Sequence, residues 1–230
     1  MRIDIVTIFP EIFKSVFEFG IIRRAREASL LSIGVHDLRD YCQDRHRSTD
    51  DAPYGGGPGM VMKVEPLVTA VEALSGSVDI ESEQRRLLLL SARGKPLEQH
   101  HVREYSRAEQ VILVAGRYEG VDERFVEATK AEEVSIGDYV LSGGEIPVMV
   151  IVDAIIRLLP GALSDSASAE QDSFSRGILD YPHYTRPSKY RGLEVPDVLL
   201  SGNHNAVQEW REKRALNDTK VRRPELLGIK

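Results

Sequence analysis

Cysteine and metal-ligand patterns are almost absent from this 230-residue sequence. Cys42 is the only cysteine, which excludes an internal disulfide and a thiolate-rich metal site and fits a reducing compartment. The six histidines are scattered along the chain, without the short spacings of a metal site. We therefore predict no protein-bound metal.

Long apolar runs are also lacking. The longest, residues 146–159, is too short to span a bilayer and contains Asp153 and Arg157. The first apolar run includes Asp4 and ends at Pro10, too early for a signal peptide. We expect a cytoplasmic protein that does not associate with a membrane.

The chain has no excess of positive charge. Its net charge is −6, whereas proteins that bind nucleic acid usually present a basic surface. The charge is uneven, because residues 180–230 hold 10 Lys and Arg against 7 Asp and Glu, which gives +3 there and −9 for residues 1–179. We expect any polyanionic partner to bind the C-terminal segment and local basic clusters.

The composition, 42% hydrophobic and 29% charged, is typical of a globular protein. Residues 1–160 alternate short β-branched runs with helical patterns, which predicts an α/β domain with a largely parallel sheet. Strands are predicted at residues 3–8, 31–38, 87–91 and 111–115. Residues 87–90 are four consecutive leucines, so this strand should be buried on both faces.

Helices are predicted over residues 64–74, from Pro96 onward, and over residues 146–159. The last of these is nearly all apolar, too hydrophobic for a surface helix with one buried stripe, which indicates either a core helix or a dimer interface. Residues 161–176 are small and polar, as in a flexible interdomain linker. Residues 177–230 then predict a small helical domain, with a helix over residues 203–216.

Four segments are rich in glycine: residues 54–60, 91–94, 116–120 and 136–145. The last three follow or lie within predicted strands, and parallel folds bind ligands at the carboxyl ends of strands. For any one of these segments, a simple turn of the chain is as good an explanation as a ligand-binding loop. Three such segments in succession favour a ligand site.

Phosphate-binding fingerprints are missing from all four segments. None ends in Gly-Lys-Ser/Thr, and none is a G-x-G-x-x-G motif after a strand. A hydrolase or dehydrogenase that uses a phosphorylated nucleotide would need such a fingerprint. A nucleotide-like ligand must therefore be held in another way.

Six longer blocks occur in a fixed order along almost the whole chain: residues 50–60, 115–124, 135–147, 172–174, 180–187 and 199–204. In composition and order these blocks resemble the bacterial tRNA (guanine-N1)-methyltransferases. The resemblance implies methyl transfer from S-adenosylmethionine to N1 of the guanine just 3′ of the anticodon, position 37 of tRNA. The alternative is a non-catalytic RNA-binding protein with a nucleotide pocket.

The resemblance also implies a fold that periodicity does not reveal. It implies that residues 1–160 form a deep trefoil knot of the SPOUT superfamily, which holds the methyl donor. It further implies a homodimer whose active sites are built from both subunits, which gives the apolar helix over residues 146–159 a role.

By motif position, the resemblance implies a donor site made of three segments. Backbone groups of residues 136–141 would bind the adenine edge, and Glu119 the polar end of the donor. Ala92 stands where most relatives have proline, which puts the rigidity of its loop in doubt. The implied donor-binding residues are Leu90, Ser91, Ala92, Gly116, Tyr118, Glu119, Ile136, Gly137, Asp138, Tyr139, Val140, Leu141, Gly143 and Gly144.

Guanine N1 carries a proton, so methylation at N1 requires a base. The matching motif makes Asp172 the candidate base. The alternative is that Asp172 is a solvated linker residue or a helix cap. Loss of the proton moves negative charge to O6, and Arg157 is the candidate donor to that oxygen. The alternative for Arg157 is a structural ion pair with Asp153, one turn earlier.

RNA contacts are expected from the region around residues 45–50 and from the C-terminal segment. The resemblance implies that Asp50 binds the base preceding the target, and Arg186 is a candidate phosphate ligand. The sequence leaves open whether Mg²⁺ assists the reaction. Further candidates for phosphate binding or base stacking are Arg45, His46, Arg47, Tyr184, Lys189, Tyr190, Arg191, Arg211, Lys213, Arg214, Arg222 and Arg223.

Overall fold

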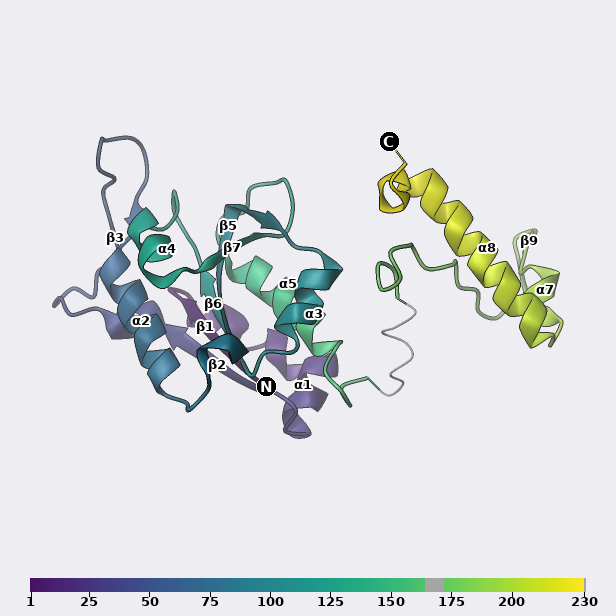
Figure 1. Ribbon diagram of the computed structural model, residues 1–230, viewed down its shortest axis with the longest axis horizontal. Coiled ribbons are helices and arrows are strands. Elements are labelled where there is room, and N and C mark those ends of the chain that lie inside the picture. The colour runs from purple at the N-terminus through teal and green to yellow at the C-terminus, as the bar shows by residue number, and fades with distance from the viewer. Residues whose placement is uncertain (164–171, 230) are drawn as a thin grey trace. The chain divides into compact units, whose positions relative to one another are not determined.

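The computed structural model describes residues 1–163 and 172–229. The chain divides into two compact units, Met1–Ser164 and Asp165–Lys230 (Figure 1). Residues 164–171, the middle of the predicted linker, lie outside the described residues. Each unit is considered by itself below.

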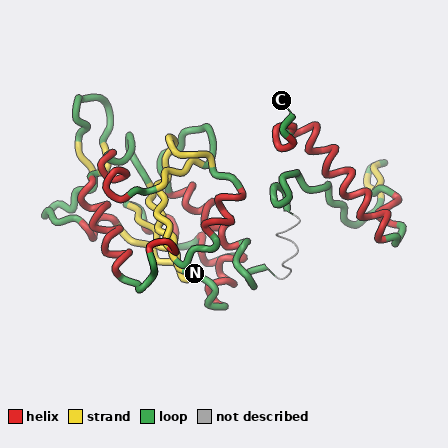
Figure 2. The backbone as a smooth tube through the Cα atoms, viewed as in Figure 1, coloured by secondary structure: helices red, strands yellow, loops and turns green. Residues whose placement is uncertain are grey.

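A five-stranded sheet forms the centre of the N-terminal unit (Figure 2), and all of its neighbouring strands are parallel. The strands are, in order across the sheet, β2 (Ser32–Asp37), β1 (Arg2–Thr7), β6 (Gln110–Ala115), β5 (Arg85–Pro96) and β7 (Glu132–Ser135). This confirms the predicted parallel α/β architecture and four predicted strands. The edge strand β7 was not predicted, because Glu132 and Glu133 interrupt its apolar pattern.

Helices cover both faces of the sheet (Figure 1). One face packs against α1 (Gly20–Glu27), α3 (Gln99–Tyr105) and α5 (Glu145–Ile156), the other against α2 (Val64–Gly76) and α4 (Glu123–Thr129). In β5, Leu88 and Leu90 belong to the first core and Leu89 to the second. The strand is therefore buried on both faces, as four consecutive leucines predict.

The shorter elements of this unit are η1 (Pro10–Phe13), η2 (Val16–Glu18), η3 (Leu38–Tyr41), β3 (Asp50–Asp51), β4 (Val61–Met62) and η4 (Ser82–Gln84). Strands β3 and β4 are antiparallel, and the glycine-rich segment over residues 54–60 connects them.

The predicted helix starting at Pro96 is wrong. Pro96 is the last residue of β5 and pairs with Ser135 of β7, and the Leu97 N–H continues the ladder to the Ser135 carbonyl. Helix α3 begins only at Gln99, after Glu98 has donated its N–H to His101 Nδ1. A proline at a strand end and a proline at a helix start are alike in sequence, and here pairing with β7 decides between them.

The C-terminal unit is built around one long helix, α8 (His204–Arg222), whose first turn is capped by the Asn203 side chain. The predicted helix over residues 203–216 matches α8 except that Asn203 is the cap, and α8 extends beyond it to Arg222. Thr219 is buried on α8 and accepts a hydrogen bond from the Leu179 N–H, which ties the preceding irregular segment to the helix. The other elements within residues 172–229 are β8 (Lys189–Tyr190), β9 (Leu193–Glu194), α7 (Asp197–Leu200) and η5 (Pro224–Leu227). No helix within residues 1–163 and 172–229 is long and apolar enough to cross a membrane.

A buried carboxylate joins the three strands at one side of the sheet. Asp4 of β1 is fully buried and accepts hydrogen bonds from Arg2 (2.7 and 3.0 Å), His36 of β2 (2.9 Å) and Gln110 of β6 (2.8 Å). Burial alone raises the pKa of Asp4, but the hydrogen bonds from His36, Arg2 and Gln110 outweigh it and lower the pKa below its ordinary value of 3.8.

Replacing this charge tests its contribution to folding. We expect Asp4→Asn to lower the free energy of unfolding by about 2–3 kcal/mol at pH 7, since an amide cannot accept from all three donors. The folded-state pKa is lowered, so the stabilisation is present above about pH 4 and is lost as the pH falls through the folded pKa. Urea denaturation at pH 7 and pH 3 should therefore show a smaller difference between variant and wild type at pH 3. The exposed Asp79→Asn is the control, and an equal difference at both pH values would contradict the assignment.

Candidate functional site

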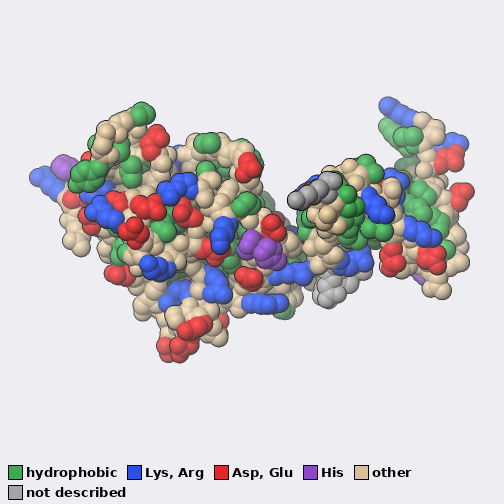
Figure 3. Space-filling model, turned by 45° about the horizontal axis from the view of Figure 1, so that its top comes forward, with side chains coloured by type: hydrophobic (Ala, Val, Ile, Leu, Met, Phe, Trp, Pro, Cys, Tyr) green, Lys and Arg blue, Asp and Glu red, His purple; other side chains and the backbone are tan. Residues whose placement is uncertain are grey.

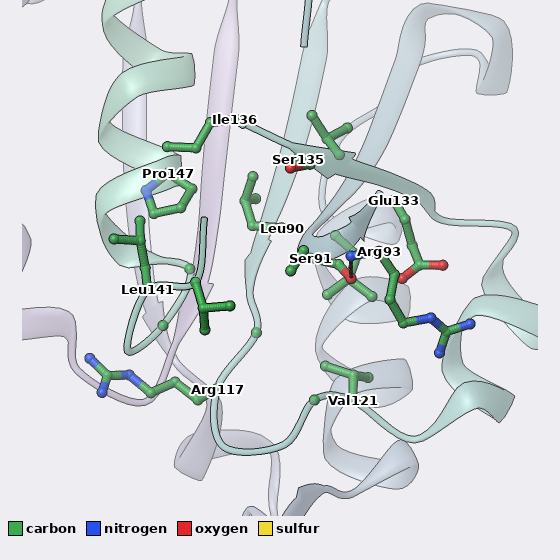
Figure 4. Close-up of a pocket in the computed structure, with 18 of the residues that line it drawn as sticks. Leu90, Ser91, Arg93, Arg117, Val121, Glu133, Ser135, Ile136, Leu141 and Pro147 are labelled. Atoms are coloured by element: carbon green, nitrogen blue, oxygen red, sulfur yellow. Dashed lines mark hydrogen bonds between the residues drawn. The ribbon is translucent and has the colours of Figure 1, made fainter. Parts of the chain in front are cut away.

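A cavity of about 310 Å³ lies at the carboxyl ends of β5, β6 and β7 (Figure 4). Three segments, residues 89–93, 116–121 and 133–144, supply most of its wall, and Pro147 of α5 closes one side. The volume is in the range of pockets that hold a small organic ligand. The glycine-rich segments predicted to meet at this edge of the sheet thus do so.

The cavity gathers nearly all the residues implied as donor ligands. Of the fourteen, only Asp138 is not part of its wall, and the Asp138 side chain is exposed in the loop before α5. The other thirteen line the cavity: Leu90, Ser91, Ala92, Gly116, Tyr118, Glu119, Ile136, Gly137, Tyr139, Val140, Leu141, Gly143 and Gly144.

One wall is an irregularity of β5. Leu90 and Lys95 both pair with Val134 of β7, so residues 91–94 leave the ladder and bulge toward the cavity. The Ser91 hydroxyl accepts a hydrogen bond from the Arg93 N–H (3.1 Å), which tightens this bulge. A side chain on Gly94 would lie 2.4 Å from the Val134 nitrogen, so only glycine fits against β7 here.

The opposite wall depends on two glycines that let backbones touch. The Gly144 N–H donates to the Gly116 carbonyl (2.8 Å), and a Cβ on Gly144 would lie 2.7 Å from the Ala115 Cα. A Cβ on Gly116 would likewise lie 2.9 Å from the Leu90 carbonyl oxygen. The ends of β5 and β6 and the start of α5 therefore converge with no side chain between them.

Behind this contact lies a buried carboxylate. Glu145, whose side chain is 2% exposed, accepts from the Thr7 hydroxyl (3.0 Å) and from Arg117 Nε (3.1 and 3.3 Å). The Arg117 guanidinium also lies 4.5 Å from the centre of the Phe9 ring. Arg117 is thereby held at one side of the cavity by an ion pair and an aromatic face.

The loop over residues 135–144 is shaped by its own hydrogen bonds. Ser135 Oγ accepts from the Gly137 N–H (3.2 Å) and donates to the Gly137 carbonyl (3.1 Å). Gly137 has φ +147°, and the Tyr139 hydroxyl donates to the Ile136 carbonyl (3.3 Å). The loop is therefore pre-shaped around backbone groups, which suits recognition of a flat, polar edge.

The β3–β4 hairpin brings Asp50 to the same region. The phenol of Tyr118, which lines the cavity, has a raised pKa because of burial and then because of the charge of Asp50 and a hydrogen bond with it. The Glu119 N–H donates to the Met60 carbonyl (3.0 Å), and Gly59 packs directly against the Glu119 side chain. Asp50 and the donor-site candidates therefore form one continuous surface.

Three other predicted residues are not among those that line this cavity. Arg157 follows the last residue of α5, whereas the cavity is at the first turn, so the 12 residues of the helix separate them by roughly 18 Å. Asp172 and Arg186 belong to the C-terminal unit, where the Asp172 carbonyl accepts from the Ser175 N–H (3.1 Å). The cavity of the N-terminal unit thus holds no predicted catalytic residue from its own described segments.

Four charged residues of the cavity wall were missed by sequence reasoning: Arg93, Arg117, Glu123 and Glu133. The first two stand inside glycine-rich segments, which was a usable signal. Glu123 begins α4 and Glu133 lies in the unpredicted strand β7, so their place became visible only with the fold. Among the described residues, no group of three or more His, Cys, Asp or Glu side chains is arranged to hold a metal ion.

Comparisons with known proteins identify the family of this chain. The model of the tRNA (guanine-1)-methyltransferase TrmD family matches residues 1–229. Proteins named tRNA (guanine-N(1)-)-methyltransferase are similar over the whole chain. One from Methylococcus capsulatus is 54% identical over 230 residues, which cover 100% of this chain and 90% of that protein. The protein from Heliobacterium modesticaldum is 50% identical over 228 residues, which cover 99% of this chain and 84% of that protein. The protein from Pseudomonas fluorescens is 52% identical over 227 residues, which cover 99% of this chain and 90% of that protein.

The buried ion pair behind the cavity gives a direct test of how the wall is held. Glu145→Gln keeps the shape but leaves Arg117 without its counter-charge, so we expect the free energy of unfolding to fall by about 2–3 kcal/mol. Urea denaturation measures this, with the exposed Glu127→Gln of α4 as the matched control. Identical midpoints for the Glu145 variant and the wild type would show that the pair does not hold the wall.

Proposed function

The chain belongs to the tRNA (guanine-N1)-methyltransferase family, and we propose that it transfers the methyl group of S-adenosylmethionine to N1 of guanine 37 in tRNA. The carrying observation is identity of 50–54% over essentially the full length with proteins named for this activity. The family match confirms the resemblance predicted from the sequence. A non-catalytic RNA-binding protein is not favoured, because the similarity is to enzymes and covers 99–100% of the chain.

The cavity fits the proposed donor. S-adenosylmethionine, when bound, supplies a methyl group that its sulfonium already activates for transfer. Backbone groups of the loop over residues 136–141 are available to the adenine, and Glu119 is available to the polar end. Leu90 and Leu141 add apolar wall on either side of the cavity (Figure 4).

We assign the deep trefoil knot to the segments that build this cavity. Its support is the direct contact between the loop after β6 and the segment that opens α5, where Gly144 bonds Gly116 and Arg117 pairs with Gly143. Such a close approach of two segments that are distant in sequence, without intervening side chains, agrees with the tight packing of loops in a knot.

The position of Arg157 supports a homodimer with shared active sites. Arg157 lies a helix length from the cavity of its own chain. We therefore expect its guanidinium to act at the methyl-donor site of a partner subunit. On α5 it shares one face with Ile146 and Val150, because these positions are four and seven residues apart. Ile146 is 52% exposed and Val150 43% exposed, which is apolar surface for the partner to cover.

Catalysis then requires a base and an oxyanion donor. Asp172 takes the N1 proton of guanine, which frees the N1 electron pair for the methyl group. Arg157 donates to O6, where negative charge develops as the proton leaves. The chain's own residues thus create the nucleophile and stabilise its charge.

Both units are assigned contacts to the tRNA. Asp50, beside the cavity, accepts from the base preceding the target, and residues 177–230 bind the backbone, with Arg186 among the phosphate ligands. The net charge of +3 over residues 180–230 supports this division. On the face of the N-terminal unit drawn in Figure 3, basic and acidic side chains are instead interspersed. We place the enzyme in the cytoplasm, where tRNA is modified.

The role of Asp172 is tested by Asp172→Asn, which keeps the shape and removes the base. We expect methyl transfer to slow by roughly a hundredfold to ten-thousandfold, the usual loss on removing a general base. Single-turnover methylation at saturating donor and tRNA isolates this step. Stability and donor affinity should hardly change, because asparagine keeps the size of the side chain and still accepts hydrogen bonds. Transfer at near the wild-type rate would exclude Asp172 as the base.

The shared site is tested with a heterodimer of two inactive subunits. One carries Arg157→Ala, and the other carries Ile136→Trp, which fills the cavity. Purified through two different tags, this heterodimer should recover about half of wild-type activity, since one of its two sites combines an intact cavity with an intact Arg157. Each variant homodimer is the control. Activity of the heterodimer no higher than that of the homodimers would place Arg157 and the cavity of one site in the same subunit.

A further inference from the structure

Arg93 occupies the rim of the cavity at the bulge of β5. The bulge places residues 91–94 outside the ladder, and the Ser91 hydroxyl fixes the Arg93 backbone. In Figure 4, the Arg93 and Glu133 side chains lie together on one side of the cavity, and Arg117 lies on the other. Arg93 is therefore a cation set at the edge of the proposed donor site.

Two carboxylates flank this guanidinium. Arg93 Nη1 lies 2.9 Å from Glu123 Oε2, at the first residue of α4, and Glu133 acts on Arg93 through its charge. The pKa of Arg93 is raised mainly by the hydrogen bond and charge of Glu123 and then by Glu133. The rim thus presents one positive group between two negative ones.

The other arginine of the cavity wall is not available in the same way. Arg117 is bound to the buried Glu145 and to the face of Phe9, and its side chain is 22% exposed. The Arg93 side chain is 71% exposed and that of Glu123 is 52% exposed. Exposed ion pairs of this kind contribute little to stability, so a ligand can replace Glu123 on Arg93 at small cost.

We propose that Arg93 binds the α-carboxylate at the amino-acid end of the methyl donor, in exchange for Glu123. This inference rests on the proposed function. A guanidinium binds a carboxylate through two parallel N–H donors, which favours the exchange. Glu123 and Glu133, like Glu119, then face the α-ammonium of the same group. The alternation of charge on the rim matches a zwitterion.

The test compares two ligands that differ in the amino-acid end alone. S-adenosylhomocysteine carries the carboxylate and ammonium, and 5′-methylthioadenosine lacks both. We expect Arg93→Gln to weaken S-adenosylhomocysteine about tenfold, the range of a charge-assisted hydrogen bond, and to leave 5′-methylthioadenosine unchanged. Isothermal titration calorimetry on the full chain measures both Kd values. Arg107→Gln, which removes an exposed charge at the opposite end of β6, is the matched control.

Each outcome bears on a separate claim. Selective weakening of S-adenosylhomocysteine supports the role of Arg93, and equal weakening of both ligands overturns it, since the variant has then disturbed the cavity as a whole. Unchanged affinity for both, with tight binding by the wild type, also overturns it and leaves the donor assignment in place. Failure of the wild type to bind either ligand overturns the donor assignment itself.

Discussion

The buried carboxylate of Glu145 holds together the part of the N-terminal unit that forms the cavity. It is buried at the first residue of α5 and takes hydrogen bonds from Thr7 at the end of β1 and from Arg117 just after β6. Since a buried carboxylate is tolerated only with such partners, three segments far apart in sequence are forced to meet at one point. The Gly116–Gly144 backbone contact lies directly beside that point, and the cavity opens from it.

The resulting cavity has a wall of backbone and glycine instead of the phosphate-binding loop that many α/β enzymes carry. This agrees with the chemistry of the proposed donor, which contains adenosine but no phosphate. A nucleotide phosphate is commonly held by a row of N–H donors at a helix N-terminus. An adenine edge and a zwitterion require donors and acceptors of both kinds, which the loop over residues 136–141 and the rim around Arg93 supply.

Much of this arrangement follows from the sequence, and the exceptions have physical causes. β-branched and leucine runs predict four of the five strands, because burial between two helical layers demands them. Strand β7 escapes prediction because Glu132 and Glu133 occupy an edge position, and the role of Pro96 is settled by pairing with Ser135. The resemblance supplies thirteen residues of the cavity wall. The pairing of Arg93 with Glu123 depends on the register shift in β5, a property of the sheet that no local pattern encodes.

The strand order also affects how the chain folds during its synthesis on the ribosome. β1 is the first strand to be synthesised, yet it lies inside the sheet, between β2 and β6. The strand β6, which pairs with one edge of β1, begins only at Gln110. At translation rates of roughly 5–20 residues per second, that edge of β1 therefore stays unpaired for on the order of 5–20 s after β1 is made. During this interval the backbone N–H and C=O groups along that edge of β1 lack the hydrogen-bond partners that β6 later supplies.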